Sequence, residues 1–145
     1  MEEDQYKATY NRLAEVRCVF EKALTNNQAS CAKSSHFWLA DREGYACKCR
    51  ECSDTCDELL KTLRQKSSFV LKLREVDGPL PHNMDIRVQV GGLRGLARLV
   101  QHDEVDDVHR IITQALDEYG AIDALPFSTL VQSVEQFKAR RRRSR

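Results

Sequence analysis

The sequence lacks an apolar run of the roughly 18 residues that a membrane-spanning helix needs. Its first residues, Met1-Glu2-Glu3-Asp4, also lack the basic start and apolar core of a secretory signal. The sequence therefore predicts neither secretion nor a membrane partner. We expect a cytoplasmic or nuclear protein.

Common catalytic motifs are missing as well. The segment Gly91-Gly92-Leu93-Arg94-Gly95 lacks the lysine and the hydroxyl that hold phosphate and magnesium in a P-loop. Neither a nucleophile elbow, nor an H-E-x-x-H motif, nor the H-x-E and P-C-x-x-C pair of zinc deaminases occurs. We therefore expect no enzymatic activity, and we expect the glycines to let the chain turn from a strand into a helix.

Length and composition fit one folded domain. The chain has 145 residues, of which 41% are hydrophobic and 31% are charged, and these fractions are close to globular averages. No internal repeat or low-complexity linker divides it. We expect a single folded domain over residues 1–137, followed by a basic tail over residues 138–145.

Helical periodicity recurs along most of the chain. Apolar residues at steps of three and four predict a helix over 2–24, and Ser53 as an N-cap predicts a second helix over about 53–66. The same spacing predicts helices over 93–100 and 105–119 and from Pro126 into the arginine run, and Gly120 ends the second of these three.

Alternating apolar and polar residues predict two strands, over 69–74 and 84–90. Asp77-Gly78-Pro79 breaks the chain between them, which favours an antiparallel hairpin with a longer loop. Residues 28–50 show no sustained period, and we expect an irregular segment there. The predicted fold is α+β and mostly helical, with four to five helices, one antiparallel β-hairpin and a small Cys-rich zinc-binding segment at 28–66.

Four cysteines crowd into ten residues, where neighbouring thiols pair only with strain. We expect them to be reduced and to bind Zn²⁺, which takes four ligands in a tetrahedron. The predicted ligands are Cys47, Cys49, Cys52 and Cys56.

The general form is similar to that of zinc-finger sites, with two ligands from a tight turn and two from a helix start. The first pair is C-x-C, however, where C-x2–4-C is usual. Because four contiguous ligands are therefore crowded, Cys31 or His36 is the alternative for one of them. An iron–sulfur cluster, redox-active or regulatory thiols and inert thiols are the other interpretations of the cluster. Cys18, on the first predicted helix, is expected to be an ordinary core residue.

The C-terminal end is strongly basic. Its basic residues are Lys138, Arg140, Arg141, Arg142, Arg143 and Arg145. Without these six, the 23 basic residues fall to 17 against 22 acidic ones, so the rest of the chain carries a net charge of −5. Such a tail binds phosphates, which favours nucleic acid as a partner, and the alternative is a solvated helix end that complements the helix dipole.

The sequence thus predicts a small zinc-binding regulatory protein that contacts RNA or DNA through its basic C-terminal tail. The alternative is a non-enzymatic adaptor or assembly subunit that is stabilised by structural zinc and binds a protein partner or a second copy through helical faces. A thiol redox switch is the third interpretation.

Overall fold

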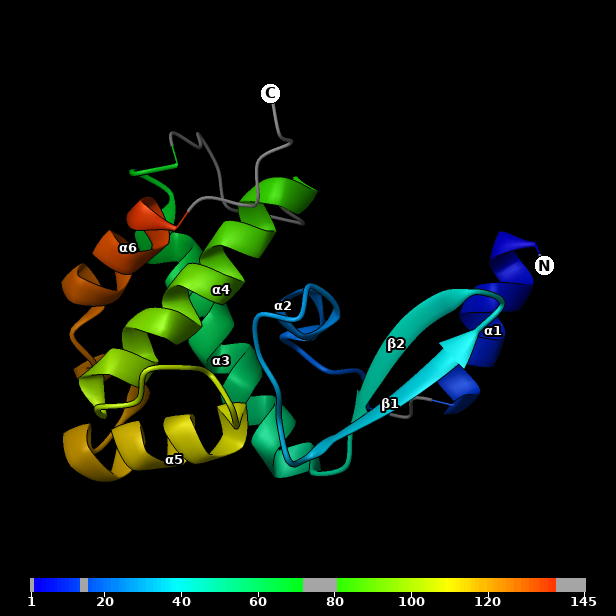
Figure 1. Cartoon of the computed structure of the whole chain (residues 1–145), viewed down its shortest axis with the longest axis horizontal. Coiled ribbons are helices and arrows are strands. Elements are labelled where there is room, and N and C mark those ends of the chain that lie inside the picture. The colour runs from blue at the N-terminus through cyan, green and yellow to red at the C-terminus, as the bar shows by residue number, and fades with distance from the viewer. Residues whose placement is uncertain (1, 14–15, 72–80, 138–145) are drawn as a thin grey trace.

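Six α-helices, one 3-10 helix and one two-stranded hairpin make up the described part of the chain (Figure 1). The structure is a computed structural model that describes residues 2–13, 16–71 and 81–137. In order, its elements are α1 (Glu3–Leu13), α2 (Glu21–Thr25), β1 (Ser34–Leu39), β2 (Arg42–Cys47), α3 (Arg50–Ser67), α4 (His82–Leu99), α5 (Val108–Tyr119), η1 (Ile122–Ala124) and α6 (Phe127–Gln136). The predicted class, α+β and mostly helical with one antiparallel hairpin, is confirmed at this level. None of the described helices has the length and apolarity to cross a membrane.

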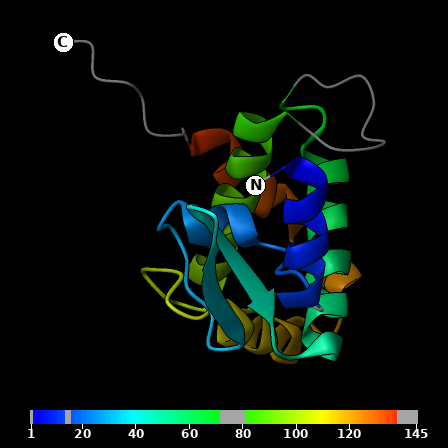
Figure 2. The ribbon, with the colours of Figure 1, turned by 90° about the vertical axis from the view of Figure 1, so that its right-hand side faces the viewer.

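Helix α4 is the centre of a helical body that also contains α2, α3, α5 and α6. It contacts each of these four helices, and Figures 1 and 2 show them gathered around it. The core side chains of this body are mostly aliphatic, and the largest fully buried ones include Phe20, Leu59, Leu63, Leu93, Leu96, Ile111 and Leu130. Their burial supplies the main driving force for folding.

The strand predicted over 84–90 is wrong, because these residues belong to α4. Neighbours of α4 cover most sides of this stretch, so Asp85 and Gln89 are buried together with Ile86, Val88 and Val90. A helix that is buried nearly all round lacks the polar face that reveals the helical period in a sequence. Of the other predicted strand, residues 69–71 form a turn after α3 and residues 72–74 lie outside the described part.

The expected turn at Gly91-Gly92 is also wrong, because both glycines lie inside α4. A Cβ atom on Gly91 would come within 2.6 Å of the Cα of Val134 in α6. The missing side chain therefore allows the backbones of α4 and α6 to approach closely. Gly95, one turn later, faces Ser133 and Leu130 of α6 in the same way.

The hairpin lies at 34–47, inside the segment that was expected to be irregular. β1 and β2 pair in antiparallel register from Ser34 opposite Cys47 to Leu39 opposite Arg42. Ala40 and Asp41 form the two-residue connection with φ values of 51° and 71°. Two positive φ angles are the signature of a type I′ turn, which Asn-Gly usually announces in a sequence. Ala-Asp gives no such signal, so the hairpin could not be recognised.

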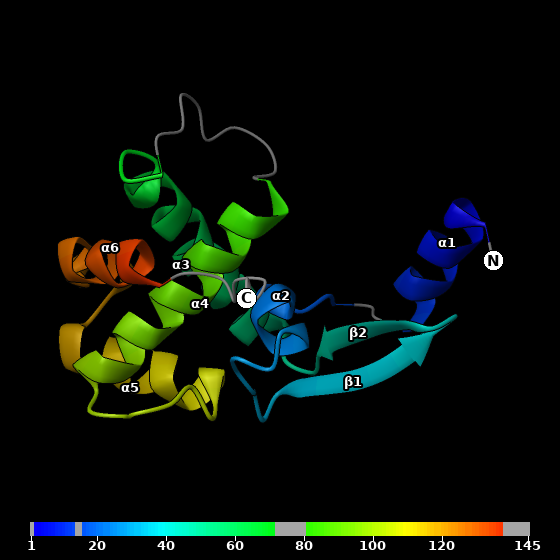
Figure 3. The same ribbon diagram turned by 45° about the horizontal axis from the view of Figure 1, so that its top comes forward.

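The predicted first helix, 2–24, is two helices, α1 and α2, and residues 16–20 between them are not helical. α1 packs on the hairpin, where Tyr6 joins Phe37, Leu39 and Ala46 in a small apolar cluster. Arg42 binds Glu3 at 3.1 Å and lies over the Tyr6 ring. We call α1, β1 and β2 the arm, because Figures 1 and 3 show them extending to one side of the helical body.

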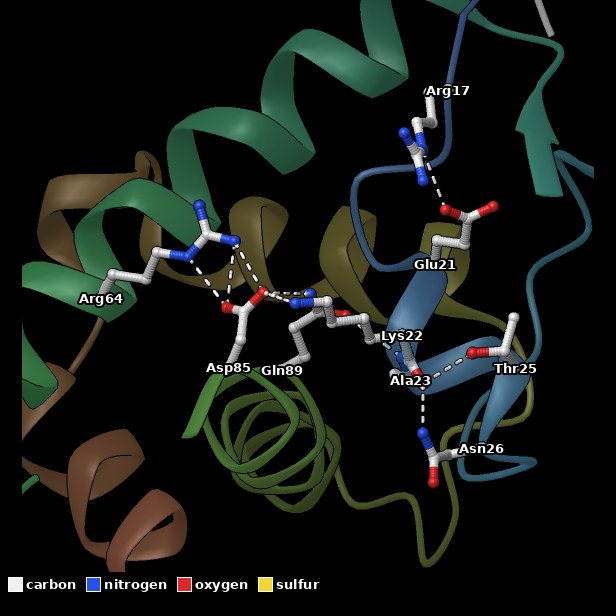
Figure 4. A network of polar contacts seen from close by, with 9 residues as sticks. All are labelled: Arg17, Glu21, Lys22, Ala23, Thr25, Asn26, Arg64, Asp85 and Gln89. Atoms are coloured by element: carbon white, nitrogen blue, oxygen red, sulfur yellow. Dashed lines mark hydrogen bonds and ion pairs between the residues drawn. The ribbon is translucent and has the colours of Figure 1, made fainter. Parts of the chain in front are cut away.

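A buried carboxylate connects three helices of the body (Figure 4). Asp85 of α4 is only 3% exposed and accepts two hydrogen bonds of 3.0 Å from the guanidinium of Arg64 in α3. Lys22 of α2 lies 3.0 Å from the same carboxylate. Gln89 donates to Asp85 at 3.2 Å and accepts from the backbone N–H of Ala23 at 3.1 Å. The network therefore fixes α2 and α3 against α4.

Replacing Asp85 with Asn should destabilise the fold, because Arg64 and Lys22 would lose the counter-charge they share. Both cations are partly exposed, so we expect the free energy of unfolding to fall by about 2–4 kcal/mol. This is less than the largest losses found when one partner of a fully buried ion pair is removed. Urea unfolding measures the free energy. Asp57→Asn is the matched control, since it breaks the exposed Asp57–Lys61 pair and should cost under about 0.5 kcal/mol. Equal losses in the two variants would contradict the structural role of Asp85.

Candidate functional site

Five of the six cysteines line one cavity at the point where the arm joins the helical body. The cavity encloses about 310 Å³, and its sulfur-bearing residues are Cys18, Cys31, Cys47, Cys52 and Cys56. Leu24, Val108 and Ile112 contribute apolar wall, while Lys33 and His109 contribute polar groups. We call this the sulfur cavity.

Cys18 reaches the cavity because residues 16–18 run beside β2. Arg17 forms an isolated antiparallel bridge with Ala46. The backbone N–H of Cys18 donates to the carbonyl of Tyr45 at 3.1 Å, and that of Cys47 donates to the carbonyl of Val16 at 2.7 Å. These bonds bring Cys18 and Cys47 together at the base of the hairpin.

Cys31 is held by the loop that precedes α5. Ser30 donates its N–H to the carbonyl of Val105 at 3.0 Å and accepts from the N–H of Val108 at 2.8 Å. The N–H of Ala32 donates to Asp107 Oδ1 at 3.0 Å. His109, at the start of α5, lines the same cavity as Cys31.

Cys49 and Cys52 form a disulfide, which corrects the expectation that every thiol of the cluster is reduced. Cys49 is the extended N-cap of α3 and Cys52 lies in its first turn, so their Cα atoms are 5.2 Å apart. This separation suits a disulfide without movement of the backbone. The four remaining cysteines, Cys18, Cys31, Cys47 and Cys56, are free and half-buried.

Burial raises the pKa of three thiols of the cavity. It raises the pKa of Cys56 to about 12, and repulsion from Cys18, Cys31 and Cys47 adds to the increase. Burial likewise raises the pKa of Cys18 to about 12, although a hydrogen bond from the N–H of Phe20 to the sulfur opposes this. The pKa of Cys31 is also raised by burial. Without a cation in the cavity, these sulfurs stay protonated at neutral pH.

The predicted metal ligands reach the cavity only in part. Cys47, Cys52 and Cys56 line it together with the alternative ligand Cys31, whereas Cys49 is not among the lining residues. His36 is engaged elsewhere: its Nε2 lies 2.7 Å from Glu43, and its ring stacks on Tyr45 at 4.6 Å. As the side chains stand, no three Cys, His, Asp or Glu residues of the described ranges are grouped so that they could hold a metal ion. The four-cysteine set proposed from the sequence stays a prediction.

Two cavity residues were not recognised from the sequence. Cys18 was expected to be an ordinary core residue and His109 was not a candidate, but both line the cavity. Their positions depend on the pairing of residues 16–18 with β2 and of residues 30–32 with the loop before α5. These contacts join segments far apart in the sequence, so no local pattern indicates them.

The predicted nucleic-acid-binding residues, Lys138, Arg140, Arg141, Arg142, Arg143 and Arg145, lie outside the described part of the chain. One face of α6 packs inside the molecule. Phe127, Leu130 and Val134 are buried, and α6 lies against α4 and α3.

Alkylation at pH 8 tests the burial of the cavity thiols. In metal-free native protein, Cys18 and Cys56 should react with iodoacetamide about 50-fold more slowly than in urea, because the scarcity of thiolate outweighs its greater nucleophilicity. Mass-spectrometric peptide mapping after timed quenching gives the rate at each cysteine. Equal rates in the native and the unfolded chain at Cys18 and Cys56 would show that the cavity is open.

Comparison with known proteins finds no match. No protein-family model matches the chain, and neither a curated protein nor a solved structure is significantly similar to it. The case for a function therefore depends on the chain's own residues, above all on the sulfur cavity.

Proposed function

We propose that the chain is a small, non-enzymatic regulatory protein that binds Zn²⁺ in the sulfur cavity and contacts RNA or DNA through its basic C-terminal tail. One observation supports the metal above all. Cysteines from the loop before α2, the loop before β1, the end of β2 and the first turns of α3 line a single cavity. A fold that gathers sulfur from four separate segments is better explained by a shared ligand than by ordinary core packing.

The chemistry of the cavity favours zinc. Thiolates are soft ligands that select zinc or iron–sulfur clusters, while carboxylates and carbonyls suit magnesium and calcium. A zinc ion held by four thiolates has no open position for a water or a substrate, so it stabilises structure and does not activate a reactant. This agrees with a regulatory protein that lacks catalytic motifs.

The basic tail supports the nucleic-acid part of the proposal. It carries six of the 23 basic residues, whereas the rest of the chain has a net charge of −5. Binding would therefore be concentrated in the tail, salt-sensitive and largely indifferent to base sequence.

Elemental analysis tests the metal. Protein purified under a non-thiol reductant should contain about one zinc ion per chain, which is the content of a single tetrahedral thiolate site. Iron together with acid-labile sulfide would indicate an iron–sulfur cluster instead. Freshly purified protein with no stoichiometric metal, which also takes up none when zinc is added, would reject the metal-binding function.

Deletion of residues 138–145 tests the nucleic-acid contact. Fluorescence anisotropy with a labelled single-stranded RNA or DNA should give a plot of log affinity against log salt with a slope of about −4 for six phosphate contacts. The deletion should abolish this binding. As a control, Lys61→Ala with Lys66→Ala removes positive charge from α3 and should change affinity little. Undiminished binding by the shortened chain would exclude the tail as the contact.

Protein–protein adaptor function is the second candidate, and one observation favours it. Trp38 of β1, the only tryptophan of the chain, is 63% exposed on the arm. Exposed aromatic side chains are enriched at protein interfaces. A nuclease-resistant complex that Trp38→Ala disrupts and the tail deletion leaves intact would favour this candidate.

A further inference from the structure

The four free thiols of the chain all line the sulfur cavity. They are Cys18, Cys31, Cys47 and Cys56. They come from four separate segments, which are the loop before α2, the loop before β1, the end of β2 and the second turn of α3. Four sulfurs that line one cavity can be brought around a single ion.

The disulfide singles out the same four residues. Because Cys49 and Cys52 are bonded to each other, four free thiols are left in the chain, which is the number of ligands in a structural zinc site. The contiguous set Cys47, Cys49, Cys52 and Cys56 would need this bond to open. It would also need Cys49 to turn toward a cavity that it does not line.

We propose that Cys18, Cys31, Cys47 and Cys56 are the four ligands of a structural Zn²⁺ ion in the sulfur cavity, with Cys49 and Cys52 outside the ligand set. This inference rests on the proposed zinc-binding function and names its ligands. At a Zn–S distance of 2.3 Å, the sulfurs of a tetrahedral site lie about 3.8 Å apart. Because no three of these side chains are grouped to hold an ion as they stand, binding would require them to turn toward one another.

Such a site would fasten the arm to the helical body. Cys47 ends β2 and Cys31 lies three residues before β1, so both stand at the base of the hairpin. Cys18 is hydrogen-bonded to Tyr45 of β2, and Cys56 is in α3 of the body. The metal would thus set the orientation of the arm, including the exposed Trp38, relative to the helices.

Two double variants of the full chain separate the ligand sets, and each removes two sulfurs. Reduced, metal-free protein is titrated with Co²⁺, whose absorption reports tetrahedral thiolate ligation, and the bound Co²⁺ is then displaced with Zn²⁺. Cys49→Ser with Cys52→Ser should keep the spectrum and bind within about twofold of the native affinity. Cys18→Ser with Cys31→Ser should lose the spectrum and bind at least about 100-fold more weakly, since even the loss of a residue that supports a ligand costs about 10–100-fold.

The contiguous set predicts the reverse pattern in these two variants. Cys47→Ser, which removes a ligand common to both sets, should abolish the spectrum and is the positive control. If the Cys18/Cys31 variant fails to fold, the Cys49/Cys52 variant still distinguishes the two ligand sets. Loss of Co²⁺ ligation in that variant would overturn the inference, while the zinc-binding function would stand. If the native chain itself binds neither Co²⁺ nor Zn²⁺, the proposed function fails and the ligand set fails with it.

Discussion

The Asp85 carboxylate is the constraint on which the arrangement of the molecule depends. A buried carboxylate is tolerated only when cations and hydrogen-bond donors surround it, and here these come from α2 and α3. Helices that must meet at one charge cannot slide or rotate freely against each other. Cys18 lies just before α2, and Cys56 lies in α3, two turns before Arg64. The polar network therefore also fixes the distance between two segments that contribute sulfur to the cavity.

Few interactions stabilise the arm, except where it joins the helical body. A two-stranded hairpin is at best marginally stable alone, and the apolar cluster of the arm consists of one buried residue, Ala46, with Tyr6, Phe37 and Leu39 around it. The body, in contrast, has a continuous core around α4. The sulfur cavity lies between these two parts, at the base of the hairpin. A link between segments at the base of the hairpin would restrict the motion of the arm. The same link inside the body would have less effect, because packing already restricts motion there.

The parts of the fold that local chemistry determines were predictable. The helix predicted over about 53–66 lies within α3, although α3 begins at Arg50 with Cys49 as its N-cap, so the predicted N-cap Ser53 is wrong. Gly120 ends α5 as expected, with φ of 94°. Prediction failed where tertiary context decides. The 84–90 segment alternates like a strand because its neighbours bury it from several sides, and the hairpin turn at Ala40-Asp41 has positive φ angles without the usual residues. For the cavity, the crowded residues Cys47, Cys52 and Cys56 do line it, whereas Cys18 depends on a β-bridge that no local pattern reveals.

Whether ligands are adjacent in the sequence or are brought together by the fold also affects which cysteines would share a metal. Ligands that are adjacent in sequence need a tight local turn, and C-x-C with two residues to the next cysteine leaves the backbone little freedom to surround an ion. Ligands that are far apart need loops to close, and the entropy of closing a loop grows only slowly with its length. Here the hydrogen bonds of residues 16–18 with β2 and of residues 30–32 with the loop before α5 have already closed these loops. An ion that joins Cys18, Cys31, Cys47 and Cys56 would therefore use an arrangement that the fold supplies, and the dispersed set is physically the less costly of the two.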